Sequence, residues 1–374
     1  MVKRGIRSLV YRVPHPSRFA RRVRIVPFAA LACLFMLLVE LRAASARPLD
    51  QINAAPFATS AVTIVLPPEL MAAHPATLAV FGVDGKLAPA ISVALSDGES
   101  VTTDRTGRAH FTAPASGMFL LAQAEGATAT ALIDPATGAS ESQSVTLSAF
   151  VSLRESFWLC GPGLHGDATA DSITINSHPA LVLAASPECL ITITPPATSP
   201  GIASIIVTAP GVHWVASTTF VSLAFTPPHP ALLPGQKGRL AVRVQGSAAK
   251  LNLVVENTSP DVLRFLRGDV LQVRTSGGAN NSASIEVQAS RSGDFSFHAR
   301  VVPPPDPSIA ARYLQAAASL AVTRGQHRDV EKLAKRLSHH PRNVDSERRD
   351  LTRLLDQTIP GNFRALLSAA FSAL

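Results

Sequence analysis

Short runs in which apolar and polar residues alternate dominate the chain between residues 61 and 302. The clearest run is GRLAVRV, where Leu240, Val242 and Val244 alternate with Arg239 and Arg243. A period of two places one set of side chains on each face of a strand, so it is typical of a sheet with one buried face. The pattern predicts a mainly β protein.

The alternating runs fall into three blocks, separated by polar or proline-containing segments. In the first block, the runs are bounded by Asp84-Gly85, Asp97-Gly98 and Thr106-Gly107, residue pairs that tight turns select. Strands spaced by about 8–12 residues, with turns between them, are typical of β-sandwiches. We therefore predict three consecutive sandwiches, covering residues 61–136, 145–218 and 219–302, with a polar segment between the first two.

The alternation of apolar and polar residues ends at the proline-rich linker 303–307. The remaining residues, 308–374, are predicted to be helical. Asp306 is placed to cap the first helix, and Pro307 suits its first turn. The run 309–322 is rich in Ala and Leu, which favour helices, and 329–337 places Val330 and Leu333 on one stripe. Three or four short amphipathic helices could form a small bundle or a docking arm.

The first 46 residues have the pattern of a secretory signal peptide. Eight basic residues precede the apolar run 25–39, and Ala44 and Ala46 then satisfy the small-x-small rule for cleavage. We expect cleavage after Ala46, followed by a tether over 47–60. The alternative is a signal anchor that stays in the membrane, although the run is shorter than the roughly 20 residues of a spanning helix. Either way the protein is predicted to be exported to the periplasm, cell surface or medium, or anchored in the inner membrane by one pass.

The net charge of +8 belongs to this leader. Nine of the 34 basic residues and one of the 26 acidic residues lie in 1–46, which leaves 25 of each in the mature chain. The high isoelectric point of the whole chain therefore does not indicate a basic surface that binds nucleic acid.

Two cysteines remain after the expected cleavage, Cys160 and Cys189. An oxidising compartment permits them to pair, and we favour a disulfide between them over two separate buried thiols. Trp158 and Trp214 are the only tryptophans. We expect them in the cores, because a carbohydrate module usually presents several exposed aromatic rings.

The segment that begins at Gly161 reads GPGLHG and matches the dinucleotide-binding pattern G-x-G-x-x-G. That pattern works only where a helix begins in the loop, because the helix N-terminus binds the phosphate. Here the alternating run SITIN follows, no helical period is present, and Pro162 removes one backbone amide. Gly161, Gly163 and Gly166 are instead predicted to form a structural turn.

Two blocks resemble known immunoglobulin-like families. VTTDRTGRAHFTAP, in the first block, resembles a hairpin of bacterial Ig-like and carboxypeptidase-regulatory-like modules. In the second block, about 145–215, the positions of Gly161, Gly163, Ser186, Pro195 and Gly201 resemble the landmarks of an IPT/TIG domain. Leu164 and the cysteine pair depart from that family's pattern. The resemblance implies tandem immunoglobulin-like β-sandwiches followed by a small helical region, with binding, spacing or structural roles.

No catalytic, cofactor-binding or metal-ligating set is identified from the sequence. The motifs G-x-S-x-G, H-E-x-x-H and C-x-x-C are absent. We therefore predict a non-catalytic exported protein with a structural or protein-binding role at the cell envelope and no cofactor. The alternatives are a carbohydrate-binding or cryptic hydrolase accessory protein that uses loops between modules, and a signal-anchored protein. Membrane contact is expected only through an uncleaved N-terminal segment.

Overall fold

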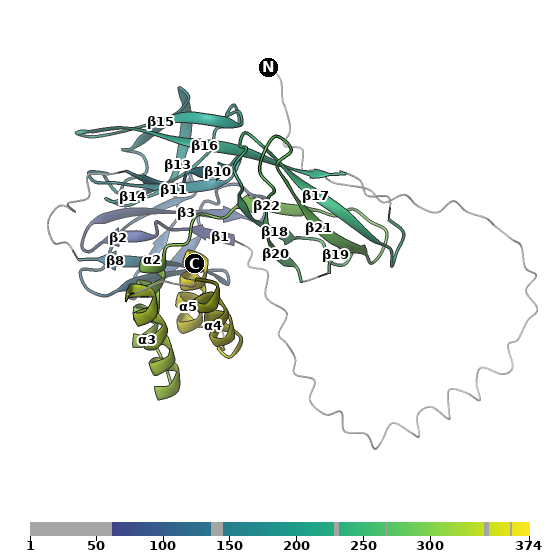
Figure 1. Cartoon of the computed structure of the whole chain (residues 1–374). Coiled ribbons are helices and arrows are strands. Elements are labelled where there is room, and N and C mark those ends of the chain that lie inside the picture. The colour runs from purple at the N-terminus through teal and green to yellow at the C-terminus, as the bar shows by residue number, and fades with distance from the viewer. Residues whose placement is uncertain (1–61, 136–144, 228–231, 267, 340–343, 360) are drawn as a thin grey trace, which may run out of the picture. The chain divides into compact units, whose positions relative to one another are not determined.

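The computed structural model describes residues 62–135, 145–227, 232–266, 268–339, 344–359 and 361–374. Figure 1 shows these residues as strands followed, at the C-terminal end of the colour bar, by helices. The expected leader, its cleavage site at Ala44 and Ala46, and the tether lie outside the described residues.

The first sandwich contains eight strands in two sheets. One sheet has the order β1-β3-β6, and the other has the order β2-β8-β7-β4-β5, with β2 parallel to β8. The core between them is aliphatic and includes Leu70, Leu78, Val93 and Leu120, all fully buried. The strands are β1 (Val62–Val65), β2 (Glu69–Met71), β3 (Pro75–Gly82), β4 (Ser92–Leu95), β5 (Ser100–Thr102), β6 (Arg108–Thr112), β7 (Phe119–Ala124) and β8 (Ala127–Asp134).

The second sandwich has the strand order of an immunoglobulin domain. One sheet is β9-β11-β14-β13, and the other is β12-β15-β16, whose strand β16 also pairs in parallel with β10. The first residues of β13 pair with β12 and its later residues pair with β14, so β13 links the two sheets. Along β15 the burial alternates, with Ile205 and Val207 directed into the core and Ser204 and Thr208 exposed. The strands are β9 (Thr146–Leu147), β10 (Phe150–Ser152), β11 (Ser156–Cys160), β12 (Ser172–Ile175), β13 (His178–Ala185), β14 (Cys189–Ile193), β15 (Gly201–Ala209) and β16 (Val212–Thr226).

The third sandwich begins inside β16, which runs through the boundary expected at 218–219. The first half of β16 pairs with β15, and the last residues of β16, Ser222–Thr226, pair with β17. One sheet is β19-β21-β17-β16 and the other is β20-β18-β22. The new strands are β17 (Lys237–Gln245), β18 (Asn252–Asn257), β19 (Leu263–Phe265), β20 (Val270–Arg274), β21 (Ser282–Ala289) and β22 (Phe297–Val301). Because one strand serves two sandwiches, no flexible segment separates them.

A charged contact also joins the second and third sandwiches. His298 on β22 lies 2.7 Å, Nε2 to Oε1, from Glu155, while Glu256 and Arg300 lie nearby. The hydrogen bond to Glu155 is the largest cause of the raised pKa of His298. A raised histidine pKa stabilises the fold below about pH 6.5, and this contribution is lost as the pH rises through the folded-state pKa.

Replacing Glu155 by glutamine is expected to flatten this part of the pH dependence. His298 is 44% exposed, so the wild-type gain between pH 8.5 and pH 6 should stay below about 1 kcal/mol. Urea unfolding of both proteins at the two pH values measures it. An equal pH dependence in the variant would show that the pair contributes nothing.

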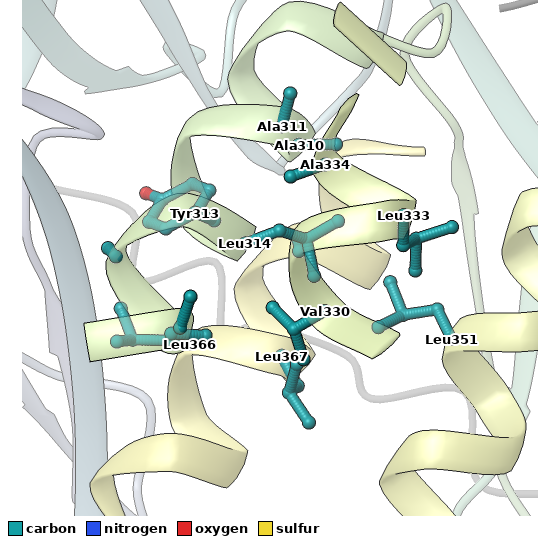
Figure 2. Packing of buried hydrophobic residues seen from close by; sticks show 14 of the residues in the cluster. Ala310, Ala311, Tyr313, Leu314, Val330, Leu333, Ala334, Leu351, Leu366 and Leu367 are labelled. Atoms are coloured by element: carbon teal, nitrogen blue, oxygen red, sulfur yellow. The ribbon is translucent and has the colours of Figure 1, made fainter. Parts of the chain in front are cut away.

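The helical region contains α2 (Pro307–Ser319), α3 (Arg324–His339), α4 (Val344–Asp356) and α5 (Asn362–Ala373). Asp306 caps α2 by accepting hydrogen bonds from the amides of Ser308 and Ile309, and Pro307 occupies its first turn, as the sequence indicated. Figure 2 shows apolar side chains of the helices, Leu314, Val330, Leu351 and Leu367 among them, pointing toward one another.

The apolar cluster of the helices continues into the first sandwich. Leu121 of β7 and Leu132 of β8 are buried in the same cluster as Leu314 and Leu366. On the rim of this contact, Gln123 donates a hydrogen bond from Nε2 to Oδ1 of Asn362 at 3.1 Å. The helical region therefore packs on the β7–β8 face of the first sandwich, not on the third sandwich that precedes it in the chain.

Candidate functional site

The predicted disulfide is present. Cys160 and Cys189 are direct cross-strand partners of β11 and β14, with Cα atoms 4.1 Å apart, and their sulfurs are bonded. A bond of this kind persists in oxidising compartments. The amide of Gly161 donates to the carbonyl of Glu188 at 2.8 Å, which carries the pairing one residue past the disulfide.

The GPGLHG segment is filled by protein and offers no phosphate cradle. A Cβ on Gly161 would lie 2.7 Å from the ring of Trp214, and one on Gly163, whose φ is +84°, would lie 2.6 Å from Val212. Gly166 has a φ of +78°, and its Cβ would lie 2.1 Å from the carbonyl oxygen of Pro75. Each glycine lets a neighbouring group approach the backbone.

This glycine turn connects the second sandwich to the first. The buried Thr77 on β3 donates from Oγ1 to the carbonyl of Gly166 at 2.9 Å and accepts from the amide of Ala168 at 3.2 Å. Arg108 on β6 donates from Nε to the carbonyl of Val182 at 3.1 Å, where β13 has an irregular register. Side chains of the first sandwich thus bind backbone carbonyl and amide groups of the second.

The two tryptophans differ from expectation. Trp214 packs against the second core, but Trp158 does not. Phe157 and Leu159 occupy the core face of β11, so Trp158 lies on the outer face, where it is half-buried. The placement of Trp158 in the core was wrong because Phe157 takes the buried position next to it.

A charged cluster lies where the first sandwich, the second sandwich and α2 meet. Arg312 donates from Nη1 to Oε1 of Glu69 at 2.6 Å and from Nη2 to Oδ1 of Asp134. Glu188, in the turn before β14, lies beside Asp134 and Glu69, and carboxylate oxygens of the three acids lie within 4.8 Å of one another. Two acids of the first sandwich therefore share the guanidinium of α2, and a third acid from the second sandwich lies beside them.

Burial and mutual repulsion perturb these acids. Burial is the largest cause of the raised pKa of Glu69, and Arg312 opposes it. The pKa of Glu188 is also raised, first by burial and then by the charges of Asp134 and Glu69. Tyr313, next to Arg312 on α2, has its pKa raised to about 12 by burial. Three acids with one cation therefore favour the protonated form of Glu188.

Three carboxylates at this spacing are the donor set that hard cations use. Here Arg312 already supplies the positive charge to Glu69 and Asp134. The arrangement therefore acts as an ionic anchor for α2. No local pattern indicates this anchor, because Arg312 lies 243 and 178 residues from its two partners.

The clearest exposed apolar surface is a groove at one end of the helical region. It has a volume of about 550 Å³ and lies between the α2–α3 and α4–α5 connections. Val322 and Ile359 line it and are 88% and 83% exposed, while Leu320 and Phe363 line its base. We call these four residues and the space between them the helical groove. The sequence analysis missed it, because the groove joins two connections that are far apart in the chain, and Leu320 and Val322 belong to the end of the apolar run 309–322.

None of the helices in the described part of the chain is both long and apolar enough to cross a membrane. The apolar run 25–39 lies outside that part.

Comparisons with known proteins identify no family. No family model matches the chain, and no curated protein matches it. Among solved structures, the plexin A4 extracellular region matches 68% of this chain and 24% of its own, at 12% identity and a TM-score of 0.24. The four N-terminal Ig domains of Dscam1 match 61% of this chain and 72% of theirs, at 11% identity and a TM-score of 0.21.

A third match is the Bacteroides ovatus protein SGBP-B of a mixed-linkage glucan utilization locus, solved with a mixed-linkage heptasaccharide. It covers 68% of this chain and 75% of its own, at 10% identity and a TM-score of 0.23. Scores this low carry no functional argument. The strand orders given above establish the fold class: tandem immunoglobulin-like β-sandwiches followed by a small helical region.

Proposed function

We propose that this chain is a non-catalytic exported protein that binds another protein through the helical groove. The observation that carries the proposal is the exposure of Val322 and Ile359 beside each other at one end of the helices. Two nearly fully exposed β-branched residues at the mouth of a groove are unfavourable in water, and such surfaces usually serve contacts with partners.

The groove selects an apolar partner surface. None of the described residues that line it is charged, whereas α3 exposes Arg328, Lys332 and Lys335 along its outer side. Polar groups are limited to hydroxyl and amide side chains such as Gln326 and Gln357. A partner that inserts an aliphatic or aromatic side chain would cover Val322 and Ile359 without stranding a charge.

The groove has a firm base. Phe363, at its base, belongs to the buried cluster that joins the helices to Leu121 and Leu132 of the first sandwich. The ionic anchor at Arg312 supports the same contact at the N-terminal end of α2. A rigid surface loses little conformational entropy when a partner binds.

Site-specific photo-crosslinking in the native envelope tests the proposal. A photoreactive benzophenone side chain at position 322 or 359 should give one discrete adduct with another protein. The matched control is position 83, because Val83 is 85% exposed but lies on the first sandwich. All three sites are exposed, so folding should change by less than about 0.5 kcal/mol.

Adducts that are equally strong at position 83, or absent at both groove positions, would contradict the proposal. An adduct made only with a second copy of this chain would replace the external partner by self-association.

Three finer assignments belong to the same proposal. The division into sandwiches at 61–136, 145–218 and 219–302 is supported by three separate apolar cores, although β16 is shared. The IPT/TIG assignment of the second sandwich is supported by its strand order and its glycine turn. Export is supported by the disulfide. The anchored alternative depends on residues outside the described part.

A further inference from the structure

A small hollow lies where the second and third sandwiches meet, away from the residues of the helical groove. It has a volume of about 200 Å³. Phe150 and Trp158 contribute from the second sandwich, and Arg300 and Pro303 contribute from the end of the third. We call it the Trp158 hollow.

The register of β11 explains why an aromatic ring is available there. Ser156, Trp158 and Cys160 point to the outer face of the sheet, and Trp158 pairs across the strands with Ile191. Trp158 is half-buried and lines the hollow. A tryptophan ring gives a large apolar contact at small cost in side-chain entropy.

Polar groups of both signs stand beside this ring. Glu155 and Arg300 line the hollow together with Ser156. Glu155 is held by His298 at 2.7 Å, and the Arg300 guanidinium, 45% exposed, lies 3.9 Å from Glu256. The surroundings thus combine two carboxylates, Glu155 and Glu256, with the two bases His298 and Arg300.

We propose that the Trp158 hollow binds one ring of a neutral carbohydrate. The C–H face of the sugar stacks on Trp158, and its hydroxyl groups donate to Glu155 and accept from Arg300. An anionic ligand would meet Glu155, a cationic one would meet Arg300, and an apolar peptide side chain would strip water from both charges without replacing their hydrogen bonds. A hydroxyl-rich ring satisfies both signs.

The size of the hollow limits the ligand. It is smaller than the roughly 300–1,000 Å³ of pockets that enclose drug-sized molecules. It therefore holds a single ring, and the neighbouring sugars of a chain remain at its mouth. This site goes beyond the proposed protein-binding role and shares no residue with the helical groove, so either can fail without the other.

Isothermal titration calorimetry of the full mature protein tests the site with three probes: cellohexaose, laminarihexaose and chitohexaose. At least one should bind, with a dissociation constant of about 1 mM or tighter. Trp158→Ala should weaken that binding by about tenfold or more, because it removes the stacking surface. Arg300→Met and Glu155→Gln should each weaken it severalfold. Arg239→Met, at an exposed ion pair of the third sandwich, should leave it unchanged.

Fluorescence supplies a second readout that does not depend on the Trp158 variant folding. The chain has two tryptophans, so Trp214→Phe leaves Trp158 as the only indole emitter. The sugar that gives heat should shift or quench this emission. Absence of heat and of any emission change with all three sugars overturns the proposal. An emission change with a proline-rich peptide but none with the sugars also overturns it and assigns the hollow to a protein ligand.

Discussion

Replacing Gly166 by alanine is expected to lower the free energy of unfolding by about 4 kcal/mol. The added Cβ would lie 2.1 Å from the carbonyl oxygen of Pro75, which is part of the backbone of β3 and has little freedom to move. The φ of +78° adds the cost of a left-handed conformation for a residue with a side chain. The first and second sandwiches must separate locally to admit the methyl group. Urea unfolding of wild type and variant measures the loss.

Gly211→Ala is the matched control for the backbone conformation. Gly211 has a φ of +82° and no heavy atom within 4 Å of its added Cβ. It should therefore lose only about 1 kcal/mol. Equal decreases in the free energy of unfolding of the two variants would contradict the prediction. They would mean that the contact between Gly166 and Pro75 does not contribute to stability and that the glycine turn does not join the sandwiches.

The second large effect is expected at the ionic anchor. Arg312→Met should lower the free energy of unfolding by about 3 kcal/mol, because Glu69 and Asp134 would remain half-buried without a cation. Since Arg312 is 33% exposed, the loss should fall at the low end for broken buried pairs. The change acts at α2, so limited proteolysis should cut the helical region earlier than in wild type.

Glu188→Gln provides the control at the same cluster. It keeps the size of the side chain, removes one repelling charge and adds an amide donor beside Asp134. Stability at neutral pH should stay the same or rise by less than about 1 kcal/mol. Burial raises the pKa values of Glu69 and Glu188, so the folded state binds these protons more tightly than the unfolded chain, and wild type gains stability as the pH falls through the raised values. A destabilised Glu188→Gln would show that this carboxylate is needed as a charge.

Local patterns predict most strands and the helical region, because one-sided burial leaves a period of two or 3.6 in the sequence. They place a boundary between residues 218 and 219, inside β16, which continues through it without a turn. They also misplace Trp158. Period-two alternation allows either face of β11 to be buried, and the face is decided by packing across the sheet.

One sequence pattern indicates that the helices pack on the first sandwich. Phe119-Leu120-Leu121-Ala122 is continuously apolar, as expected for a strand covered on both faces. In the structure Leu120 faces the sandwich core and Leu121 faces the helices. No sequence pattern indicates the ionic anchor or the helical groove, because each joins residues that are far apart in the chain.

The central claim is that the helical region is held on the β7–β8 face of the first sandwich and presents its groove from that base. Cross-linking in solution tests it directly. Gln123→Cys with Asn362→Cys, in a chain with Cys33→Ser, should be joined by a short bismaleimide in most molecules, because the native side chains are hydrogen-bonded at 3.1 Å. The control pair Gln123→Cys with Lys332→Cys, on the exposed side of α3, should stay largely unlinked. Equal linking of the two pairs, or none in the first, would contradict the account.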